Sequence, residues 1–281
     1  MMRAPSGAAR VAGVVGRPIA HSLSPVIHNA WIEAAGLDAV YAPFSPPDEG
    51  FERMIRAFRG GVICGLNVTA PFKERALALA DWADEAAQRA GSANIMLFHD
   101  DGRTEARSVD GLGLIRAFAE QAPGTRLADA RIAVLGAGGA ARAGVAAMVD
   151  AGAGQVFVLN RTAARAEELA FALDSPRLSA HALSEAERVF AECDVLINAA
   201  AGGPVPPLDA LPDHAVVMDM TYRPLKTALL RAAEARGLGV VDGLAMLIHQ
   251  AIPSFEAFFG VARPPRVDVR AIALAALGDE E

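Results

Sequence analysis

Short apolar segments alternate with helical patterns along the whole chain, and this alternation limits the possible folds more than any other feature. It is typical of βαβ units built around mostly parallel sheets, so the sequence predicts an α/β protein. The first series of strands is expected at 11–15, 41–44 and 62–67, followed by a hairpin of 93–99 and 104–109 around Asp101-Gly102. The second series is expected at 131–135, 155–160, 194–198, 215–220 and 239–241.

Helices are expected between these strands. Ser24 is predicted to be the N-cap of a helix reaching about residue 35, with Pro25 at the first helical position, where its missing N–H costs nothing. Trp31 and Trp82 lie on helical patterns, so both are predicted to pack in the first domain. The other helices are expected at 51–58, from Pro71, near 82–89, at 111–121, near 224–235, at 244–259 and at 269–277.

The composition is that of a globular protein. The chain has 281 residues, long enough for two domains, and 53% of them are hydrophobic. The formal net charge of −7, without a run of basic residues, argues against a nucleic-acid partner. No apolar run reaches about 18 residues, and residues 1–10 lack a signal peptide's hydrophobic segment, so we expect a cytoplasmic protein without a membrane partner. Cys64 and Cys193 lie in apolar segments without metal-ligand spacing, which predicts core residues and no metal site.

A glycine-rich loop follows the strand 131–135 and opens a helical pattern. Its sequence is Gly136-Ala137-Gly138-Gly139-Ala140-Ala141, which fits G-x-G-x-x-A. Glycine there permits a tight turn and lets a pyrophosphate approach the helix N-terminus. A tight turn without a ligand would use the same residues, but the order of strand, loop and helix favours a dinucleotide site.

The end of the next strand indicates which dinucleotide binds. An NAD site usually has an acidic residue there for the ribose 2′-OH, whereas this strand ends in Asn160-Arg161-Thr162, with Arg165 one turn later. Two guanidinium groups beside small polar side chains suit a 2′-phosphate, so the sequence predicts NADP. The alternative is a solvated helix start in which Thr162 is only an N-cap.

Three polar clusters follow strands of the first series, and we expect them on one side of the sheet. Ser22 and Ser24 lie beside a helix N-terminus, where two hydroxyls can bind a carboxylate. Thr69 and Lys73 lie near the start of a short helix, a position that the helix dipole makes unfavourable for a cation. Lys73 is one of only two lysines among 26 basic residues, and this scarcity of lysine favours a specific role for Lys73. Asp110 follows the hairpin and could be only an N-cap.

Five motifs occur along nearly the whole chain: Gly16-x-Pro18-Ile19-x-His21-Ser22-x-Ser24-Pro25-x-x-His28, Asn67-Val68-Thr69-x-Pro71-Phe72-Lys73, Gly136-Ala137-Gly138-Gly139-Ala140, Asn160-Arg161-Thr162-x-x-Arg165 and Asp242-Gly243-x-x-Met246-Leu247-x-x-Gln250. In these motifs and in their order, the sequence resembles the shikimate dehydrogenase family. The resemblance implies NADP-dependent oxidation of the ring 3-hydroxyl of shikimate, or in reverse the reduction of 3-dehydroshikimate.

The resemblance also implies residue roles. Ser22, Ser24 and Tyr222 would bind the substrate carboxylate, and Thr69, Asn94, Asp110 and Gln250 the ring hydroxyls. Lys73 and Asp110 would act at the reacting centre as a coupled pair that shares one proton position. The cofactor would be held by Gly136, Ala137, Gly138, Gly139 and Ala140, by Asn160, Arg161, Thr162 and Arg165, and by Met220 and Gly243 near the nicotinamide.

This interpretation gives the chain three parts. Residues 1–110 would form an α/β substrate-binding and catalytic domain, and residues 111–243 a Rossmann-type NADP-binding domain. Residues 244–281 would form C-terminal helices that return to the first domain. The protein would act on a small-molecule substrate, as a monomer or a homodimer.

The sequence departs from the family's pattern at a few positions. Where the family usually has Asn-Thr-Asp-Gly, this chain has Ser108-Val109-Asp110-Gly111, and Ile95, Ala200 and Ala245 replace Thr, Thr and Gly. Most of these changes remove a polar group beside a matched site residue. Two alternatives therefore stay open, an enzyme for quinate or another close analogue and a non-catalytic sensing module of the same fold. Retention of Lys73 and Asp110 favours the enzyme.

Overall fold

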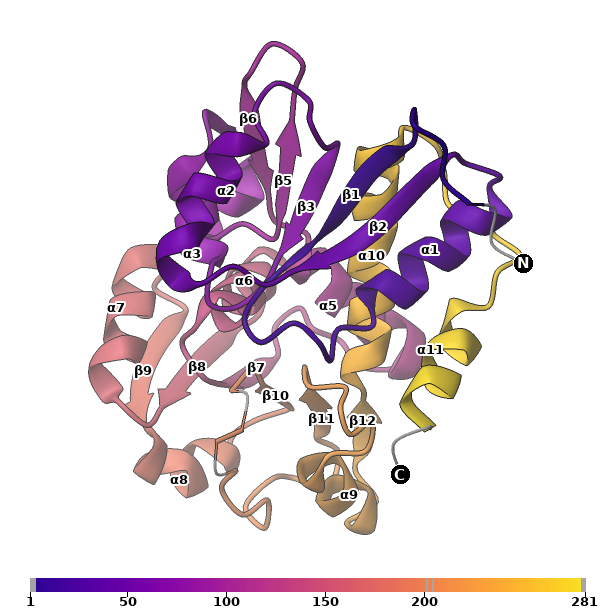
Figure 1. Cartoon of the computed structure of the whole chain (residues 1–281). Coiled ribbons are helices and arrows are strands. Elements are labelled where there is room, and N and C mark those ends of the chain that lie inside the picture. Colours follow the sequence, from indigo (N-terminus) through magenta and orange to yellow (C-terminus); the bar gives the residue numbers. More distant parts are fainter. Residues whose placement is uncertain (1–3, 201, 204, 279–281) are drawn as a thin grey trace. The chain divides into compact units, whose positions relative to one another are not determined.

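The computed structural model describes residues 4–200, 202–203 and 205–278. The chain divides into two units, with residues 1–109 and 250–281 in unit 1 and residues 110–249 in unit 2. One boundary follows Val109, and the other lies inside helix α10 (Gly243–Phe259), after His249. Within the described residues each unit contains one six-stranded sheet (Figure 1).

The sheet of unit 1 is mixed, and its strand order is β2-β1-β3-β5-β6-β4. Its strands are β1 (Arg10–Val15), β2 (Ala39–Phe44), β3 (Gly65–Val68), β4 (Trp82–Ala83), β5 (Ile95–Phe98) and β6 (Thr104–Arg107). Strands β2, β1 and β3 are parallel, whereas β5 is antiparallel to both β3 and β6. Because the direction reverses twice, β6 runs the same way as β3. The carboxyl ends of β1, β3 and β6 therefore lie at one edge of this sheet, together with the amino end of β5.

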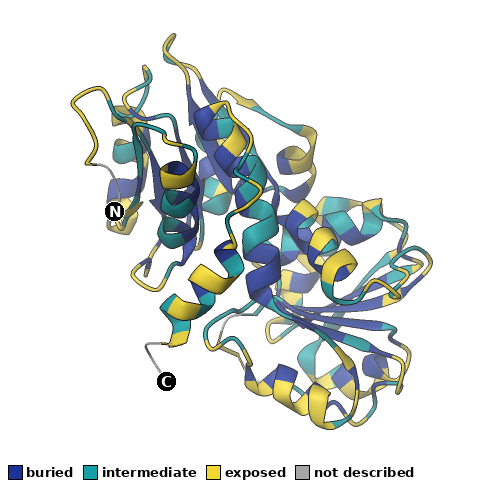
Figure 2. Cartoon of the chain, turned by 90° about the vertical axis from the view of Figure 1, so that its right-hand side faces the viewer, coloured by how far each residue is buried: buried dark blue, intermediate teal, exposed yellow. Residues whose placement is uncertain are grey.

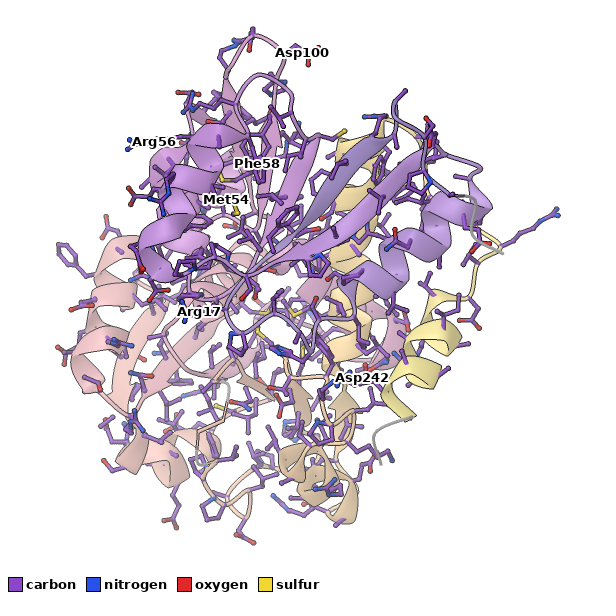
Figure 3. The ribbon with its side chains drawn as sticks, in the orientation of Figure 1. Arg17, Met54, Arg56, Phe58, Asp100 and Asp242 are labelled. Atoms are coloured by element: carbon purple, nitrogen blue, oxygen red, sulfur yellow. The ribbon has the colours of Figure 1, made fainter. Side chains whose placement is uncertain are left out.

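Helices cover both faces of this sheet. On one face, α2 (Phe51–Ala57), α3 (Lys73–Leu79) and α4 (Glu85–Ala90) pack on the strands, and Phe51 stacks on Phe72 with ring centroids 4.3 Å apart. Figure 3 shows Met54 of α2 and Phe58, the residue after this helix, directed toward the strands and Arg56 directed away. These apolar contacts hold the start of α3, and with it Lys73, against the sheet.

The other face carries α1 (Ser24–Ala34) and the part of α10 that belongs to unit 1. Trp31 of α1 is fully buried and contacts Phe255 of α10, with ring centroids 5.5 Å apart. His28 stacks on Tyr41 at 4.1 Å between ring centroids. Helix α11 (Val269–Gly278) packs against α1, so the C-terminal segment covers this unit.

Unit 2 has a fully parallel sheet with strand order β12-β11-β10-β7-β8-β9. Its strands are β7 (Arg131–Leu135), β8 (Gln155–Asn160), β9 (Leu178–Ala182), β10 (Val195–Asn198), β11 (Val216–Asp219) and β12 (Gly239–Val241). Its helices are α5 (Asp110–Gln121), α6 (Gly139–Asp150), α7 (Ala163–Leu173), α8 (Ala186–Phe190) and α9 (Ala228–Ala235). The order reverses between β7 and β10, where ligands of such sheets bind.

The side chains of β7 alternate between two apolar clusters, one on each face of the sheet. Ile132 and Val134 pack with Leu114 of α5, whereas Ala133 and Leu135 pack on the opposite side. Figure 2 shows much of the strands dark blue, whereas exposed residues lie mainly on the outer faces of the helices, in loops and near strand ends. A parallel sheet covered on both faces matches the expected Rossmann-type organisation.

Most expected elements are present within a few residues of their predicted bounds. The expected hairpin forms, and Gly102 adopts a positive φ of 87° at its turn. The predicted helix near 82–89 is only partly correct, because Trp82 belongs to the short strand β4 and Asp84 caps α4 by accepting the N–H of Ala87 at 2.7 Å. The expectation that Trp82 packs in the domain is wrong, since it is 57% exposed. Strand β9 is not predicted, because its polar sequence shows no apolar run.

The two cysteines differ in their surroundings. Cys193 is buried among apolar residues, as predicted, and burial raises the pKa of its thiol to about 12. Cys64 is half-buried, so the core prediction is only partly correct there. No group of three or more His, Cys, Asp or Glu side chains in the described residues is arranged to hold a metal ion. Within the same ranges, no helix has the length and apolarity needed to cross a membrane.

Candidate active site

The loops after β1 and β3 lie against each other at the carboxyl edge of the sheet of unit 1. The backbone N–H of Thr69 donates to the Val15 carbonyl at 2.9 Å, and that of Arg17 donates to Ala70 at 3.0 Å. A Cβ atom at Gly16 would lie 2.3 Å from Cγ2 of Thr69, so this close approach requires glycine. Figure 3 shows Arg17 at this end of the sheet and Asp100 at the tip of the hairpin at the other.

Ser22 and Ser24 lie in the loop that leads from β1 into α1. The backbone N–H of Ser24 donates to Oγ of Ser22 at 3.3 Å, and Ser24 is buried. The prediction that Ser24 is the N-cap is wrong, because the helix begins at Ser24, and Leu23 is the N-cap residue without a side-chain bond. The Ser24 hydroxyl therefore does not cap the helix, and both hydroxyls lie beside its N-terminus, which attracts anions.

Thr69 and Lys73 are held by the buried residue between them. The N–H of Phe72 donates to the Thr69 carbonyl at 3.0 Å, and the Phe72 ring is fully buried against Phe51. Lys73 follows as the first residue of α3, and its backbone carbonyl accepts the N–H of Ala93 at 3.0 Å. This bond places the start of α3 next to the segment that contains Asn94.

Asn94 is buried immediately before β5, and its side chain joins two segments. Its Nδ2 donates to Oε1 of Gln250 at 2.9 Å, and its Oδ1 accepts the backbone N–H of Val109 at 2.9 Å. Gln250 lies on α10, so a residue distant in sequence contacts the same edge of the sheet. In the described part of the chain, Nε2 of Gln250 has no hydrogen-bond partner, which leaves it as a donor for a ligand.

Asp110 and Tyr222 belong to unit 2, so the residues predicted to bind substrate are divided between the units. Asp110 is the buried first residue of α5 and directly follows Val109 in the chain. Tyr222 follows β11 in a half-buried position. Within unit 1, hydrogen bonds connect the segments that contain Thr69, Lys73, Asn94 and Gln250, whereas Ser22 and Ser24 lie in the loop after β1.

The predicted dinucleotide loop has the expected local geometry. Gly136 adopts φ 108°, and its added Cβ would lie 3.2 Å from the backbone nitrogen of Ala200, so this position requires glycine. Gly138 is exposed, and a Cβ there would meet nothing within 4 Å, so the backbone is open to an approaching group. Helix α6 starts at Gly139 and has no acidic residue in its first turn. This open cradle at a helix N-terminus fits a pyrophosphate.

The loop after β8 presents the cations that are predicted to read a 2′-phosphate. Arg161, Thr162 and Arg165 are exposed, and neither arginine has an ion-pair partner among the described residues. Thr162 occupies the N-cap position of α7, but its side chain makes no capping bond. Asn160 fixes the turn, because its Nδ2 donates to the carbonyl of Thr162 at 2.9 Å. The loop therefore has free donors for a 2′-phosphate.

Met220 and Gly243 lie together in unit 2. Met220 follows β11, and a Cβ atom at Gly243 would lie 2.4 Å from the Met220 carbonyl, so the start of α10 requires glycine. Asp242, labelled in Figure 3, caps α10 by accepting the N–H of Ala245 at 2.9 Å and also bonds to Gln121. The two residues predicted near the nicotinamide thus adjoin in space.

Asn67 opens the motif that contains Thr69 and Lys73, but the sequence assigns no role to Asn67 itself. It lies in β3, whose residues are all buried, and its side chain bonds to Tyr41, Ser254 and the Asn94 backbone. An amide side chain in a central buried strand is uncommon, because the strand interior favours apolar residues. That placement is the signal that could have identified it.

Comparisons with known proteins match both units. The family model for the shikimate dehydrogenase substrate binding domain matches residues 14–96, and the model for shikimate/quinate 5-dehydrogenase matches residues 117–205. A shikimate dehydrogenase (NADP(+)) of Caulobacter vibrioides is 50% identical over 285 residues, covering 99% of this chain and 100% of that protein.

Solved structures show the same similarity. Shikimate 5-dehydrogenase of Thermus thermophilus, in complex with NADP(H) and shikimate, is 35% identical with a TM-score of 0.82, covering 95% of this chain and 100% of that one. Quinate dehydrogenase of Corynebacterium glutamicum, in complex with NAD, is 27% identical with a TM-score of 0.84, covering 96% and 99%. With both units matched and a relative half identical over the full length, the chain belongs to the shikimate dehydrogenase family.

Proposed function

We propose that this chain is an NADP-dependent oxidoreductase that interconverts shikimate and 3-dehydroshikimate. The observation that carries this function is the grouping of polar residues at the carboxyl edge of the sheet of unit 1. Support comes from Thr69, Lys73 and Asn94, which follow or precede strands at that edge, from Gln250, which contacts Asn94, and from Ser22 and Ser24 in the loop after β1.

The substrate carboxylate binds at the start of α1. The hydroxyls of Ser22 and Ser24 supply hydrogen bonds there, and the helix N-terminus adds a partial positive charge without a formal cation. Tyr222 contributes a third hydroxyl. The ring hydroxyls bind Thr69, Asn94, Asp110 and Gln250, whose side chains together offer hydrogen-bond donors and acceptors.

Lys73 and Asp110 handle the proton of the reacting hydroxyl. When bound, NADP accepts the hydride from C3 of the ring. The hydroxyl oxygen must lose its proton at the same time, and Lys73 with Asp110 receives it as a coupled pair. Arginine cannot replace Lys73 in this role, because its guanidinium does not deprotonate in proteins.

The cofactor binds unit 2 through the residues identified from sequence. The open backbone at Gly138 and the N-terminus of α6 hold the pyrophosphate, with Gly136, Ala137, Gly139 and Ala140 forming the turn. Asn160, Arg161, Thr162 and Arg165 bind the 2′-phosphate, and Met220 and Gly243 lie at the nicotinamide.

The proposed roles follow the three parts predicted from the sequence, although the boundaries between the two compact units fall before Asp110 and after His249. Residues 1–110 bind substrate and carry the catalytic pair, residues 111–243 bind NADP, and residues 244–281 complete the substrate site through Gln250. The enzyme works in the cytoplasm, as a monomer or a homodimer.

Quinate is the second candidate substrate, favoured by the similarity to the quinate dehydrogenase of Corynebacterium glutamicum. Initial rates with shikimate and quinate, each with NADP and with NAD, test both candidates. We expect the highest kcat/KM for shikimate with NADP. Faster turnover of quinate would reassign the substrate, and binding without turnover of either acid would favour the non-catalytic alternative.

A further inference from the structure

A buried chain of hydrogen bonds runs behind Asn94 and Gln250. Tyr41 OH donates to Oδ1 of Asn67 at 2.8 Å, and Nδ2 of Asn67 donates to Oγ of Ser254 at 2.8 Å. Oγ of Ser254 in turn donates to the backbone carbonyl of Gln250 at 3.0 Å. Tyr41, Asn67 and Ser254 are 1%, 7% and 0% exposed, so these bonds form away from water.

The side-chain amide of Asn67 is fully engaged by protein groups. Its second Nδ2 hydrogen is directed to the backbone carbonyl of Asn94, at 3.2 Å, while Oδ1 accepts from Tyr41. Both donors are therefore occupied, and the residue acts through its neighbours rather than by donating to a ligand. Burying an amide is unfavourable unless its bonds are satisfied, as they are here.

The packing of α10 on β3 explains how these bonds can form. A Cβ atom at Gly65 would lie 2.5 Å from the Phe258 ring, so glycine at that position allows the helix to approach the strand. Gly65 and Asn67 lie on the same face of β3, because alternate residues of a strand share a face. Ser254 and Phe258 are separated by about one helical turn on α10. The close approach thus brings Ser254 within hydrogen-bonding distance of Asn67.

We propose that Asn67 is a positioning residue for substrate binding, acting through Ser254 and the Asn94 backbone to fix Asn94 and Gln250 relative to each other. This inference rests on the proposed function of those two residues. The direct bond from Asn94 to Gln250 joins only the tips of two side chains. Asn67 adds the connection between their backbones, so that both amides meet the ring hydroxyls already oriented.

The effect should appear in substrate affinity rather than in the chemical step. Asn94 and Gln250 are assigned to binding the ring hydroxyls and not to the proton transfer, so we expect their contacts to stabilise ground state and transition state alike. Loss of alignment therefore raises KM for shikimate and leaves kcat nearly constant. KM for NADP should not change, because the residues of this hydrogen-bond chain belong to unit 1 and the predicted cofactor loops belong to unit 2.

Steady-state kinetics of Asn67→Ala and Ser254→Ala test this role. For Asn67→Ala we expect KM for shikimate to rise about tenfold, corresponding to one lost hydrogen bond, with kcat and KM for NADP changed less than about threefold. Ser254→Ala removes only the Asn67–Ser254–Gln250 link, so its effect should have the same direction and be smaller. If Asn67→Ala does not fold, Ser254→Ala decides the matter.

Thr104→Val is the matched control. Thr104 is 1% exposed and loses a buried hydroxyl bond in the variant, but it begins β6 at the opposite edge of the sheet. It should lower the melting temperature without changing KM for shikimate. If Asn67→Ala and Ser254→Ala behave in the same way as this control, their role is only structural and the proposal is wrong.

A double-mutant cycle tests whether Asn67 acts through Gln250. In a Gln250→Ala background, Asn67→Ala should raise KM by a clearly smaller factor than in the wild type. If the KM increases of the two single variants simply multiply in the double variant, the proposal is wrong. Absence of turnover by the wild type would instead contradict the proposed function, and calorimetric Kd values for shikimate would then replace KM in the same comparison.

Discussion

Oδ1 of Asn94 accepts the backbone N–H of Val109, the residue before Asp110, at 2.9 Å. The bond ties the start of β5 to the segment after β6. Since it uses the main chain, any residue except proline at position 109 can supply it. The replacement of the family's usual threonine by valine therefore leaves this contact intact.

Position 109 and Asn94 should consequently respond differently to substitution. We expect Val109→Thr to change kcat/KM for shikimate less than about threefold, and Asn94→Ala to lower it at least about tenfold, because the proposed bond to substrate and the links to Val109 and Gln250 are lost. Parallel assays of the two variants, with melting curves for both, measure this contrast. A large gain in kcat/KM for Val109→Thr would show that the valine alters the substrate site.

Lys73 is predicted to act in the chemical step. Because a positioned proton-transfer group contributes about 10²- to 10⁴-fold, Lys73→Met should lower kcat by that factor with a far smaller change in KM. Lys73→Arg should be nearly as slow if proton transfer matters and largely active if only charge does. Lys226→Met is the control, because Lys226 is exposed, forms an ion pair with Glu234 at 2.9 Å and is far from Lys73 in the sequence. Near-normal kcat for Lys73→Met would remove Lys73 from the reaction.

Cofactor choice should depend on Arg161 and Arg165. Charge-assisted bonds to a phosphate contribute about 1.5 to 3 kcal/mol each, reduced here by solvent exposure, so Ala at both positions should lower kcat/KM for NADP at least about tenfold. The value for NAD should hardly change, because NAD has no 2′-phosphate. Arg126→Ala, an exposed arginine of the same unit, provides the control. Equal losses with both cofactors would contradict the assignment.

Most strands of both sheets and the dinucleotide loop could be predicted because their signals are local. An apolar run such as Arg131–Leu135 followed by Gly136 needs no information from elsewhere in the chain. Strand β9 lacks such a signal because it is an edge strand whose Ser179 and His181 interrupt the apolar pattern. The prediction for Trp82 fails because a large apolar side chain on a helical pattern is usually buried. Trp82 instead belongs to the short strand β4, where it pairs with Glu105 of β6.

The candidate site residues could be named from the sequence, but the connections between them could not. Ser22, Thr69 and Asp110 follow strands β1, β3 and β6, which run in the same direction, so the strand pattern alone predicts them at one edge of the sheet. The bonds from Asn67 to Ser254 and from Asn94 to Gln250 cross 187 and 156 positions of sequence, so no spacing rule could supply them. The family resemblance named Gln250, whereas only the structure identified its support by Ser254.

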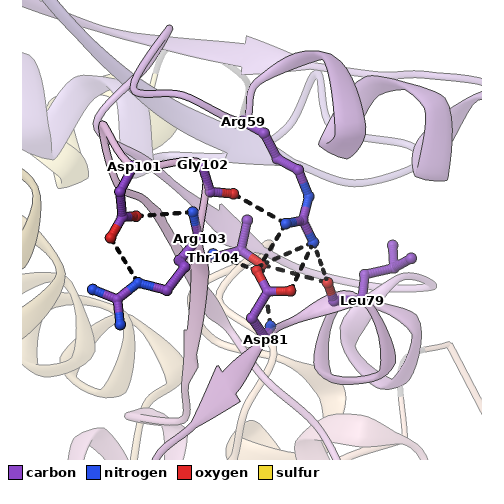
Figure 4. Close-up of polar contacts among 7 residues, drawn as sticks. All are labelled: Arg59, Leu79, Asp81, Asp101, Gly102, Arg103 and Thr104. Carbon is purple, nitrogen blue, oxygen red and sulfur yellow. Dashed lines mark hydrogen bonds and ion pairs between the residues drawn. The ribbon is translucent and has the colours of Figure 1, made fainter.

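The hairpin end of the sheet of unit 1 is held by a polar cluster (Figure 4). The Arg59 guanidinium bonds to both carboxylate oxygens of Asp81, and Thr104 donates to Asp81 from its backbone and its hydroxyl. These bonds, with Arg59 the largest cause, lower the pKa of Asp81 to about 2. A depressed carboxyl pKa contributes stability that is complete above the unfolded value of 3.8 and is lost as pH falls toward 2.

Asp81→Asn should therefore destabilise the protein at neutral pH. We expect a loss of about 1 kcal/mol, a modest value because the carboxylate is partly exposed and screened. KM for shikimate should stay constant, since this cluster lies at the edge opposite the candidate site. Urea unfolding at pH 7 and pH 3.5 measures the loss, which should shrink at the lower pH, and an equal loss at both values would contradict the charge-based explanation.

His28 should make the protein less stable in mild acid. It is completely buried, stacked on Tyr41 and surrounded by Trp31, Phe255 and Phe258, and among the described residues neither ring nitrogen has a hydrogen-bond partner. Burial lowers its pKa from 6.5 to about 3. The unfolded chain therefore binds a proton between these values and the folded chain does not, so stability falls as pH drops below 6.5.

The size of this effect is set by the pKa difference. At pH 5 the unfolded state gains about 2 kcal/mol from protonation of His28, at about 1.36 kcal/mol per pH unit. Urea unfolding of wild type and His28→Phe from pH 7 to pH 5 should show a shallower decline in the variant, whatever its absolute stability. Identical slopes for wild type and His28→Phe would mean that His28 titrates normally in the folded protein, and its apolar surroundings would then have to admit water.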